Sequence, residues 1–137
     1  MITDDKHTDR NELLVNIDNQ IAHVILNRPR ARNALTFGMY ESIAELCARA
    51  GKGDDSDRIK AIIISGAGDK AFAAGTDIGQ FTEFTDPKDG QAYEARMEMV
   101  ISKIETCKVP VIAALHGAVT GGGLVIASAV HVRIASA

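Results

Sequence analysis

Tryptophan is absent from this 137-residue sequence, and the other aromatic residues are limited to four Phe and two Tyr. A core must therefore be built mainly from Ala, Val, Ile and Leu, and a surface that stacks bases or sugars on aromatic rings is not expected. An excess of basic residues is also lacking, because 15 Lys and Arg stand against 18 Asp and Glu, which gives a net charge of −3. We therefore expect no nucleic-acid partner.

Cysteine is nearly absent as well. The only two, Cys47 and Cys107, lie far apart and belong to no CxxC or His-rich motif. We interpret both as reduced core thiols, and we expect no metal site and a cytoplasmic, reducing setting. The first residues show no apolar run behind a basic patch, so we expect no secretory signal.

Charged residues are missing between Val109 and Val132. This stretch exceeds the roughly 18 to 20 residues that make a membrane-span candidate. Pro110, His116 and the Gly121–Gly123 triplet interrupt it, however, and such residues fit buried segments of a soluble fold better. We expect no membrane association.

The length fits one domain, with a charged and mobile arm at residues 1–12 and a core at 13–137. The run Ala61–Ile64 is apolar and rich in β-branched residues, as in a parallel strand covered by helices on both faces. The pattern as a whole predicts an α/β fold with an open sheet. The expected elements are strands at 12–17 and 21–26 joined as a hairpin, a helix after an N-cap at Thr36, a strand at 61–64, a short turn after Thr76 and Asp77, a loop at 86–90, a helix at about 91–107, a strand at 111–115, a helix at 124–129 and a strand at 130–134.

Two joints rich in small residues follow the two buried strands, at residues 73–77 and 116–123. Glycine lets a ligand approach main-chain N–H groups, and a helix that starts there leaves its first N–H groups unpaired. Two such joints facing one another would form a paired donor site for one oxygen, which is an oxyanion hole. The alternative is that these glycines only allow helix and strand to pack closely.

A set of short motifs occurs in a fixed order along the chain. The motifs are Asn27-Arg28-Pro29 with Asn33-Ala34-Leu35, the run from Lys70 to Ile78, the run from Val109 to Gly117, Gly121-Gly122-Gly123-Leu124, and Val132 to Ser136. Together they resemble the enoyl-CoA hydratase/isomerase (crotonase) family. The resemblance covers nearly the whole chain after residue 12 and corresponds to the N-terminal part of the family. It implies a crotonase-like (ClpP/crotonase) spiral of ββα units, truncated before the C-terminal helical region.

The resemblance implies an acyl-CoA substrate whose thioester oxygen is held by the backbone N–H groups of Thr76 and Gly122. Coenzyme A is then part of the substrate, and no separate cofactor is expected. The resemblance also implies a homotrimer or a dimer of trimers. Arg28, Arg30 and Arg32 suit phosphate groups, although a solvated loop would explain them as well. The implied substrate-binding residues are Arg30, Ala31, Ala34, Ala74, Gly75, Asp77, Ile78, Gly121 and Val125.

The resemblance breaks at the positions where hydratases of the family carry their acid/base groups, and also at position 131. Hydratases of the family carry a glutamate where this chain has Val125, and valine transfers no proton. The second hydratase glutamate lies further along in family members. Asp77 and His116 are the nearest acid/base candidates, but the simpler interpretations are a helix cap for Asp77 and packing at the strand end for His116. His131 stands where relatives have Asp, which we interpret as strand packing or surface drift.

Three functions remain open from the sequence. The first is a hydratase or isomerase, and the second is an acyl-CoA-binding protein or truncated paralogue without turnover. The third is a dinucleotide-dependent oxidoreductase, because Gly66 to Ala71 matches G-x-G-x-x-A after a strand. That motif requires a following helix and an acidic residue about 20 positions on, and neither is evident.

Overall fold

The structure is a computed structural model that describes residues 11–136. The predicted arm at residues 1–12 lies outside the described residues except for Asn11 and Glu12. The described chain is an α/β fold with a five-stranded sheet and a two-stranded sheet. In chain order the elements are β1 (Leu13–Asp18), β2 (Ile21–Leu26), η1 (Pro29–Ala31), α1 (Phe37–Arg49), β3 (Ala61–Gly66), β4 (Ala71–Ala74), η2 (Ile78–Glu83), α2 (Pro87–Glu105), β5 (Val111–Leu115), β6 (Ala118–Thr120), α3 (Gly122–Ala129) and β7 (Val132–Ala135).

The predicted hairpin is confirmed. Strands β1 and β2 pair antiparallel, and Asp18 faces Ile21 across a two-residue turn. Asn19 and Gln20 both have positive φ, at 50° and 66°, which is the backbone that a tight hairpin turn requires.

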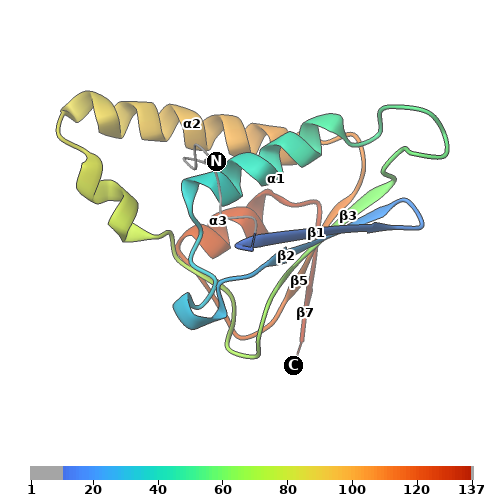
Figure 1. Cartoon of the computed structure of the whole chain (residues 1–137), viewed down its shortest axis with the longest axis horizontal. Coiled ribbons are helices and arrows are strands. Elements are labelled where there is room, and N and C mark those ends of the chain that lie inside the picture. The colour runs from blue at the N-terminus through green and yellow to red at the C-terminus, as the bar shows by residue number, and fades with distance from the viewer. Residues whose placement is uncertain (1–10, 137) are drawn as a thin grey trace, which may run out of the picture.

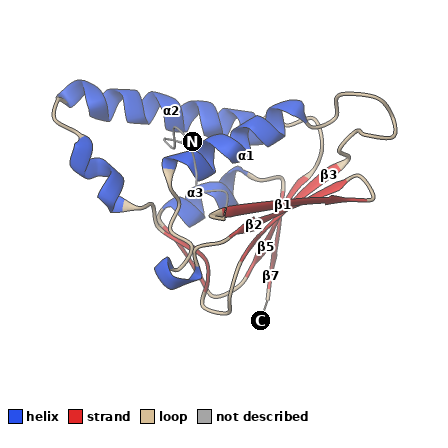
Figure 2. Cartoon of the chain, viewed as in Figure 1, coloured by secondary structure: helices blue, strands red, loops and turns tan. Residues whose placement is uncertain are grey.

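The large sheet has the order β1-β2-β3-β5-β7, and all pairs except the hairpin are parallel. Strands β2 and β3 alternate between buried and half-buried residues. Figures 1 and 2 show α1, α2 and α3 on the same side of this sheet. The expectation of helices on both faces is therefore wrong, and the alternation of burial is the physical sign of a sheet covered on one side.

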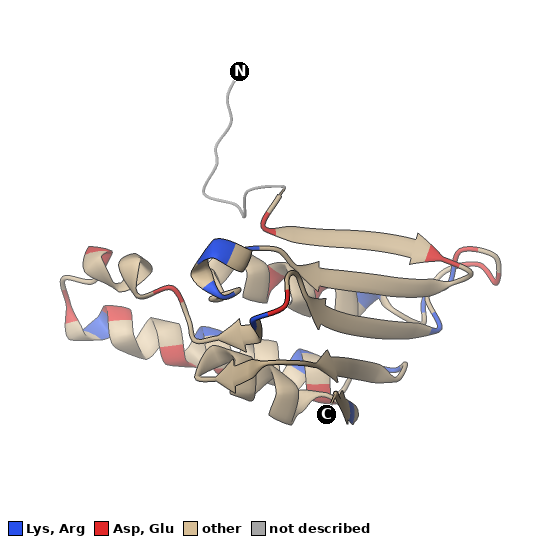
Figure 3. Ribbon diagram, turned by 90° about the horizontal axis from the view of Figure 1, so that it is seen from below, with Lys and Arg blue, Asp and Glu red and all other residues tan. Residues whose placement is uncertain are grey.

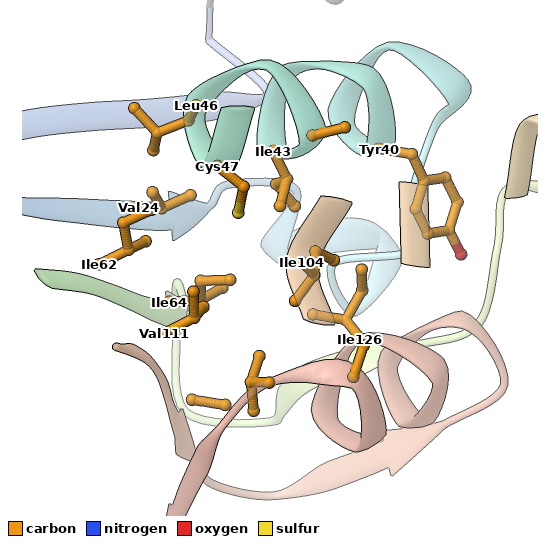
Figure 4. Close-up of a cluster of buried hydrophobic side chains, with 14 of the residues drawn as sticks. Val24, Tyr40, Ile43, Leu46, Cys47, Ile62, Ile64, Ile104, Val111 and Ile126 are labelled. Carbon is orange, nitrogen blue, oxygen red and sulfur yellow. The ribbon is translucent and has the colours of Figure 1, made fainter. Parts of the chain in front are cut away.

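Helix α1 lies over the large sheet and begins after the predicted N-cap, Thr36. The Thr36 hydroxyl accepts a hydrogen bond from Met39 N and caps the first turn. Met39, Ile43 and Cys47 are at most 3% exposed and pack against aliphatic side chains of the sheet. Figure 4 shows this cluster, with Tyr40 at its edge.

Helix α2 begins earlier than predicted, because residues 87–90 belong to it rather than to a loop. Asp86 caps the helix, Pro87 occupies its first turn, and the Asp89 carboxylate accepts a hydrogen bond from Asp86 N. Asp and Pro are typical of turns and also of helix starts, and here the second use applies. Val100 and Ile104 of this helix are fully buried, whereas Tyr93, Met97 and Ile101 are half-buried.

The small sheet pairs β4 with β6 in parallel and was not predicted. Its strands have four and three residues and consist mostly of alanine, which gives little β-strand signal. The segments that the sequence suggested as joints thus contain a second sheet.

Both cysteines are free thiols. Cys107 donates a hydrogen bond from Sγ to the Cys47 carbonyl at 3.5 Å, and burial raises the pKa of the Cys47 thiol well above its ordinary value. Among the helices of residues 11–136, none combines the length and the apolar character that a membrane crossing requires.

Candidate functional site

The two small-residue joints lie against one another at the ends of β4 and β6. Ala74 pairs with Thr120 in the small sheet, and Gly75 N donates a hydrogen bond to the Thr120 carbonyl at 2.9 Å. The next residues along the two segments, Thr76 and Gly121, therefore leave the sheet side by side. This confirms that the joints face each other.

The glycine triplet at the start of α3 is needed for this close approach. A Cβ atom on Gly121 would lie 2.9 Å from Gly75 Cα, and one on Gly122 would lie 2.6 Å from Thr76 Oγ1. On Gly123 it would lie 2.0 Å from the Ala73 carbonyl oxygen. Close packing therefore explains the glycines, and the same packing brings the two joints together.

The backbone N–H groups of Thr76 and Gly122 are both unpaired with respect to the residues that the structure describes. Gly122 is the first residue of α3, where the helix leaves an N–H free and carries partial positive charge. The neighbours of Thr76 are anchored, because Leu35 N donates to the Gly75 carbonyl at 3.0 Å and Asp77 N donates to the Leu35 carbonyl at 2.9 Å. Free main-chain donors at adjoining joints are the kind of group that a site for an oxygen atom with growing negative charge requires.

Tyr40 of α1 reaches this site and had no assigned role in the sequence analysis beyond its helix. Its phenol oxygen shares a hydrogen bond with Thr76 Oγ1 at 2.8 Å. The side chain is 1% exposed, and burial raises the pKa of Tyr40 to about 12. The phenol is therefore neutral at ordinary pH. The position of Tyr40 in the predicted helix, next to Met39, could have indicated a buried phenol that needs a hydrogen-bond partner, but not which residue that partner is.

Asp77 acts as a helix cap, which confirms the simpler of its two interpretations. Its Oδ1 accepts from Gly79 N at 2.9 Å, and its Oδ2 accepts from Arg28 Nη2 at 2.9 Å. Arg28 also lies 3.6 Å from the Glu12 carboxylate and donates to the Ala34 carbonyl at 2.6 Å. Both charged groups thus have structural partners already.

The loop with the remaining arginines is joined directly to the site. Ala74 N donates to the Arg32 carbonyl at 2.9 Å, so the loop runs along the end of β4. Arg30 and Arg32 are exposed and line a hollow of about 230 Å³ together with Lys70 and Asp69. Figure 3 shows the basic turn η1 at one end of the strands. This surface is suited to bind an anion.

Asn33 holds this loop in place, and the sequence analysis assigned it no such role. The side chain is fully buried, at 0% exposure. Its Oδ1 accepts from Arg28 N, and its Nδ2 donates to the carbonyls of Ala67 and Ala71, each at 2.9 Å. Its φ of 57° lies in the left-handed region that asparagine tolerates.

The other predicted site residues are more scattered. Ala31 is exposed on η1, and Ala34 is half-buried beside it. Ile78 is 80% exposed at the start of η2. Val125 and Gly121 line a hollow of about 370 Å³ beside α2, which brings the position of the missing glutamate next to the joint.

The two histidines considered from the sequence have different settings. His116 Nε2 is buried and forms no hydrogen bond with residues 11–136, and no described contact links it to Thr76 or Gly122. His131 Nδ1 accepts from Val111 N at 3.0 Å, and its Nε2 lies 3.1 Å from the Glu105 carbonyl. His131 therefore joins β5 to the end of α2, which agrees with a packing role.

The dinucleotide-binding alternative is contradicted by the fold. The motif at Gly66 to Ala71 leads through a turn into β4 rather than into a helix. A helix N-terminus that would hold a pyrophosphate is thus missing at this point of the described chain. Within the same residues, no group of three or more metal-binding side chains is found.

Comparison with known proteins shows which family the chain matches. A family model described as enoyl-CoA hydratase/isomerase matches residues 16–137. A short-chain-enoyl-CoA hydratase from Clostridium acetobutylicum is 33% identical over 126 residues, which are 92% of this chain and 47% of the relative. A peroxisomal Δ(3,5)-Δ(2,4)-dienoyl-CoA isomerase from Arabidopsis thaliana is 31% identical over 132 residues, with 88% and 46% coverage.

Solved structures agree. An enoyl-CoA hydratase/carnithine racemase from Magnetospirillum magneticum superposes with a TM-score of 0.78 at 35% identity, over 90% of this chain and 46% of that one. An enoyl-CoA hydratase from Mycobacterium smegmatis gives a TM-score of 0.79 at 29% identity, over 90% and 47%. The chain thus spans about half the length of the relatives that it matches.

Proposed function

Because the chain belongs to the enoyl-CoA hydratase/isomerase family, we propose that it binds an acyl-CoA thioester and holds the thioester oxygen between the N–H groups of Thr76 and Gly122. One observation carries this proposal. The two amides stand at adjoining joints, and neither donates a hydrogen bond to a described residue.

Such a donor pair has a definite chemical consequence. Hydrogen bonds to the thioester oxygen stabilise the negative charge that forms when the α-proton leaves or when a nucleophile adds at the β-carbon. Removal of one donor from such a site typically costs about 10²–10³ in rate. The pair therefore suits hydratase or isomerase chemistry, that is, a lyase or isomerase type of enzyme.

The basic loop supports the coenzyme A part of the proposal. Arg30, Arg32 and Lys70 surround a hollow that would take the phosphates of the nucleotide. Arg28 is held by Asp77 and Glu12 and has a structural role instead. Ala74 and Gly75 connect this hollow to the amide pair, along the line that the pantetheine arm would follow. From the family resemblance we also place Ala31, Ala34, Asp77 and Ile78 beside this path.

A second candidate function is acyl-CoA binding without turnover. Val125 occupies the position of a hydratase glutamate, and the Asp77 carboxylate is taken up by the helix cap and by Arg28. General acid/base catalysis needs a proton-transfer group within about 2.6–3.2 Å of the reacting atom. Neither Val125 nor the engaged Asp77 carboxylate is available as such a group.

One experiment tests the proposal and separates its two forms. The chain is incubated with a short enoyl-CoA while the absorbance of the conjugated thioester is followed, and binding is measured by calorimetry. Loss of absorbance supports the enzyme, and binding with constant absorbance supports the binding protein. No heat of binding and no absorbance change would contradict both. Free coenzyme A serves as the control for recognition of the nucleotide alone.

We also propose that the chain self-associates as a homotrimer or a dimer of trimers in the cytoplasm. Several large apolar side chains are exposed on β1 and β7, including Val15, Ile17 and Ile134 at 45%, 46% and 61%. Exposed apolar surface of this kind favours association. Light scattering of the purified chain tests the oligomer, and a monomer at all concentrations would contradict it.

A further inference from the structure

A buried tyrosine on α1 touches both halves of the proposed oxyanion hole. The phenol oxygen of Tyr40 is 2.8 Å from Thr76 Oγ1. The same oxygen occupies the space in front of Gly122, because a Cβ atom there would lie only 2.1 Å from it. Tyr40, Thr76 and Gly122 come from three different elements, and this phenol is where they meet.

We propose that Tyr40 is a positioning residue that sets the spacing of the two amide donors by holding the Thr76 hydroxyl and by packing against Gly122. This inference rests on the proposed function, because it concerns the same site. It adds a side-chain pair to a site otherwise formed by main-chain groups.

The need for such a residue follows from the geometry of the joints. An oxyanion site works only when its donors are fixed before the reaction, with distances of about 2.7–3.1 Å to the oxygen. Thr76 and Gly122 have no hydrogen bond of their own N–H groups to described residues that would fix them. Main-chain bonds with Leu35 hold the residues on either side of Thr76, but none of the described hydrogen bonds joins Thr76 to Gly122, and the Tyr40 phenol supplies that link.

Tyr40 is suited to give that support because its own position is rigid. Its side chain is 1% exposed, and its neighbours Met39 and Ile43 on α1 are 0% and 1% exposed. Figure 4 shows Tyr40 at the edge of the aliphatic cluster, with its ring carried by α1. A ring that is fixed in a packed core moves little, so a group that it contacts is also held in place.

The electrostatics of the phenol suit the same role. Burial raises the pKa of Tyr40 to about 12, so the group is neutral throughout the ordinary pH range. A neutral hydroxyl does not repel an oxygen that gains negative charge, whereas a phenolate would.

The test uses a chromophoric arylacryloyl-CoA, whose absorbance moves to longer wavelength when its carbonyl oxygen is polarised. The shift reports on the donors, and the dissociation constant reports on binding. The variants are Tyr40→Phe and Thr76→Val, which each remove one hydroxyl of the pair, and Thr76→Ser, which restores it. Tyr93→Phe is the matched control, since Tyr93 is the other tyrosine and belongs to an aromatic cluster with Phe37 and Phe81.

We expect Tyr40→Phe and Thr76→Val to lose at least about half of the shift while the dissociation constant changes by less than about threefold, because positioning acts on donor geometry rather than on the nucleotide contacts. Thr76→Ser and Tyr93→Phe should keep the native shift. A full shift in both hydroxyl-deleted variants overturns the inference, and so does an equal loss of shift and affinity. If the native chain binds the probe without any shift, or not at all, the proposed function fails and the inference fails with it.

Discussion

The large sheet with α1 and the small sheet with its glycine joints are stabilised in different ways. In the large sheet, buried Ile, Val and Leu side chains fill the space between strands and helix. In the small sheet, backbone atoms of β4 lie so near to the start of α3 that even a methyl group would overlap with them. Side-chain volume holds the first region, and close backbone approach holds the second.

This difference separates the two tasks of the molecule. A core of aliphatic side chains tolerates swaps of similar volume, because neighbours adjust at small cost. A pair of main-chain donors tolerates very little, because its geometry is set by the backbone itself. We therefore expect that one added methyl group at the joint strongly destabilises the chain, whereas loss of one methylene in the large sheet destabilises it only slightly.

The largest effect is expected for Gly123→Ala at the joint. The new Cβ would lie 2.0 Å from the Ala73 carbonyl oxygen, and both segments are backbone that cannot move independently. We expect a loss of about 3 kcal/mol or more in the free energy of unfolding, measured by urea denaturation. The control is Gly90→Ala in α2, where nothing lies within 4 Å and a stabilisation of about 0.5–1 kcal/mol is expected. If Gly123→Ala and Gly90→Ala were equally stable, the joint would be no more sensitive to an added methyl group than this position of α2.

A smaller but still large effect is expected for Asn33→Ala, beside the joint. The substitution removes the side chain that bonds Arg28 N and the carbonyls of Ala67 and Ala71. Buried groups left without partners cost about 1–3 kcal/mol each, so we expect a loss of roughly 2–4 kcal/mol by urea denaturation. Asn16→Ala, at an exposed position of β1, is the control and should be nearly neutral. A neutral Asn33→Ala would show that the loop is held by other contacts.

Alkaline pH provides a reversible test of the contact between the regions. The pKa of Tyr40 is about 12 in the folded chain against 10.0 ordinarily. Between these values the unfolded chain has lost the phenol proton and the folded chain retains it. The stability from this group is therefore complete below pH 10 and falls as pH rises toward 12.

Thermal unfolding from pH 8 to 12 measures this loss. Tyr40→Phe should show a shallower decline than the native chain, since it has no proton to lose there. The buried Cys47 thiol, whose pKa is also raised, contributes to the decline of both proteins. Identical pH profiles would contradict the burial of the phenol.

The smallest effect is expected in the large sheet, for Ile64→Val. Ile64 is fully buried at 0% exposure in β3. Loss of one methylene should cost about 0.5–1.5 kcal/mol, and binding of an acyl-CoA should stay unchanged. Urea denaturation and calorimetry check the two expectations. A loss as large as that of Gly123→Ala would mean that the sheet is as intolerant as the joint.

The difference between side-chain packing in the large sheet and close backbone approach at the joints also explains which parts of the fold could be predicted from the sequence. The hairpin, α1 and the parallel strands follow from side-chain periodicity, which is visible locally. The small sheet was missed because β4 and β6 are short and rich in alanine, and the first turn of α2 was missed because Asp86 and Pro87 also suit a loop. Helices on both faces were expected because an apolar run does not show which side is covered.

In the candidate site, too, some features could be predicted from the sequence and others could not. Thr76 and Gly122 were named through resemblance; the structure shows that their joints adjoin, whereas their role stays a prediction. The roles of Asn33 and Tyr40 depend on partners more than 30 positions away in the sequence, at Ala67 and Thr76. Contacts of this range have no local signal, so they could not be predicted from the residues alone.

The central claim is tested most directly by the amide resonances of the chain during titration with an acyl-CoA. In ¹H–¹⁵N correlation spectra, the amide protons of Thr76 and Gly122 should move downfield together and saturate at the same ligand concentration. The Gly90 amide, on α2, should stay in place. If an acyl-CoA binds and the resonances of Thr76 and Gly122 do not move, or only one of them does, the two amides do not hold the thioester oxygen and the account is wrong.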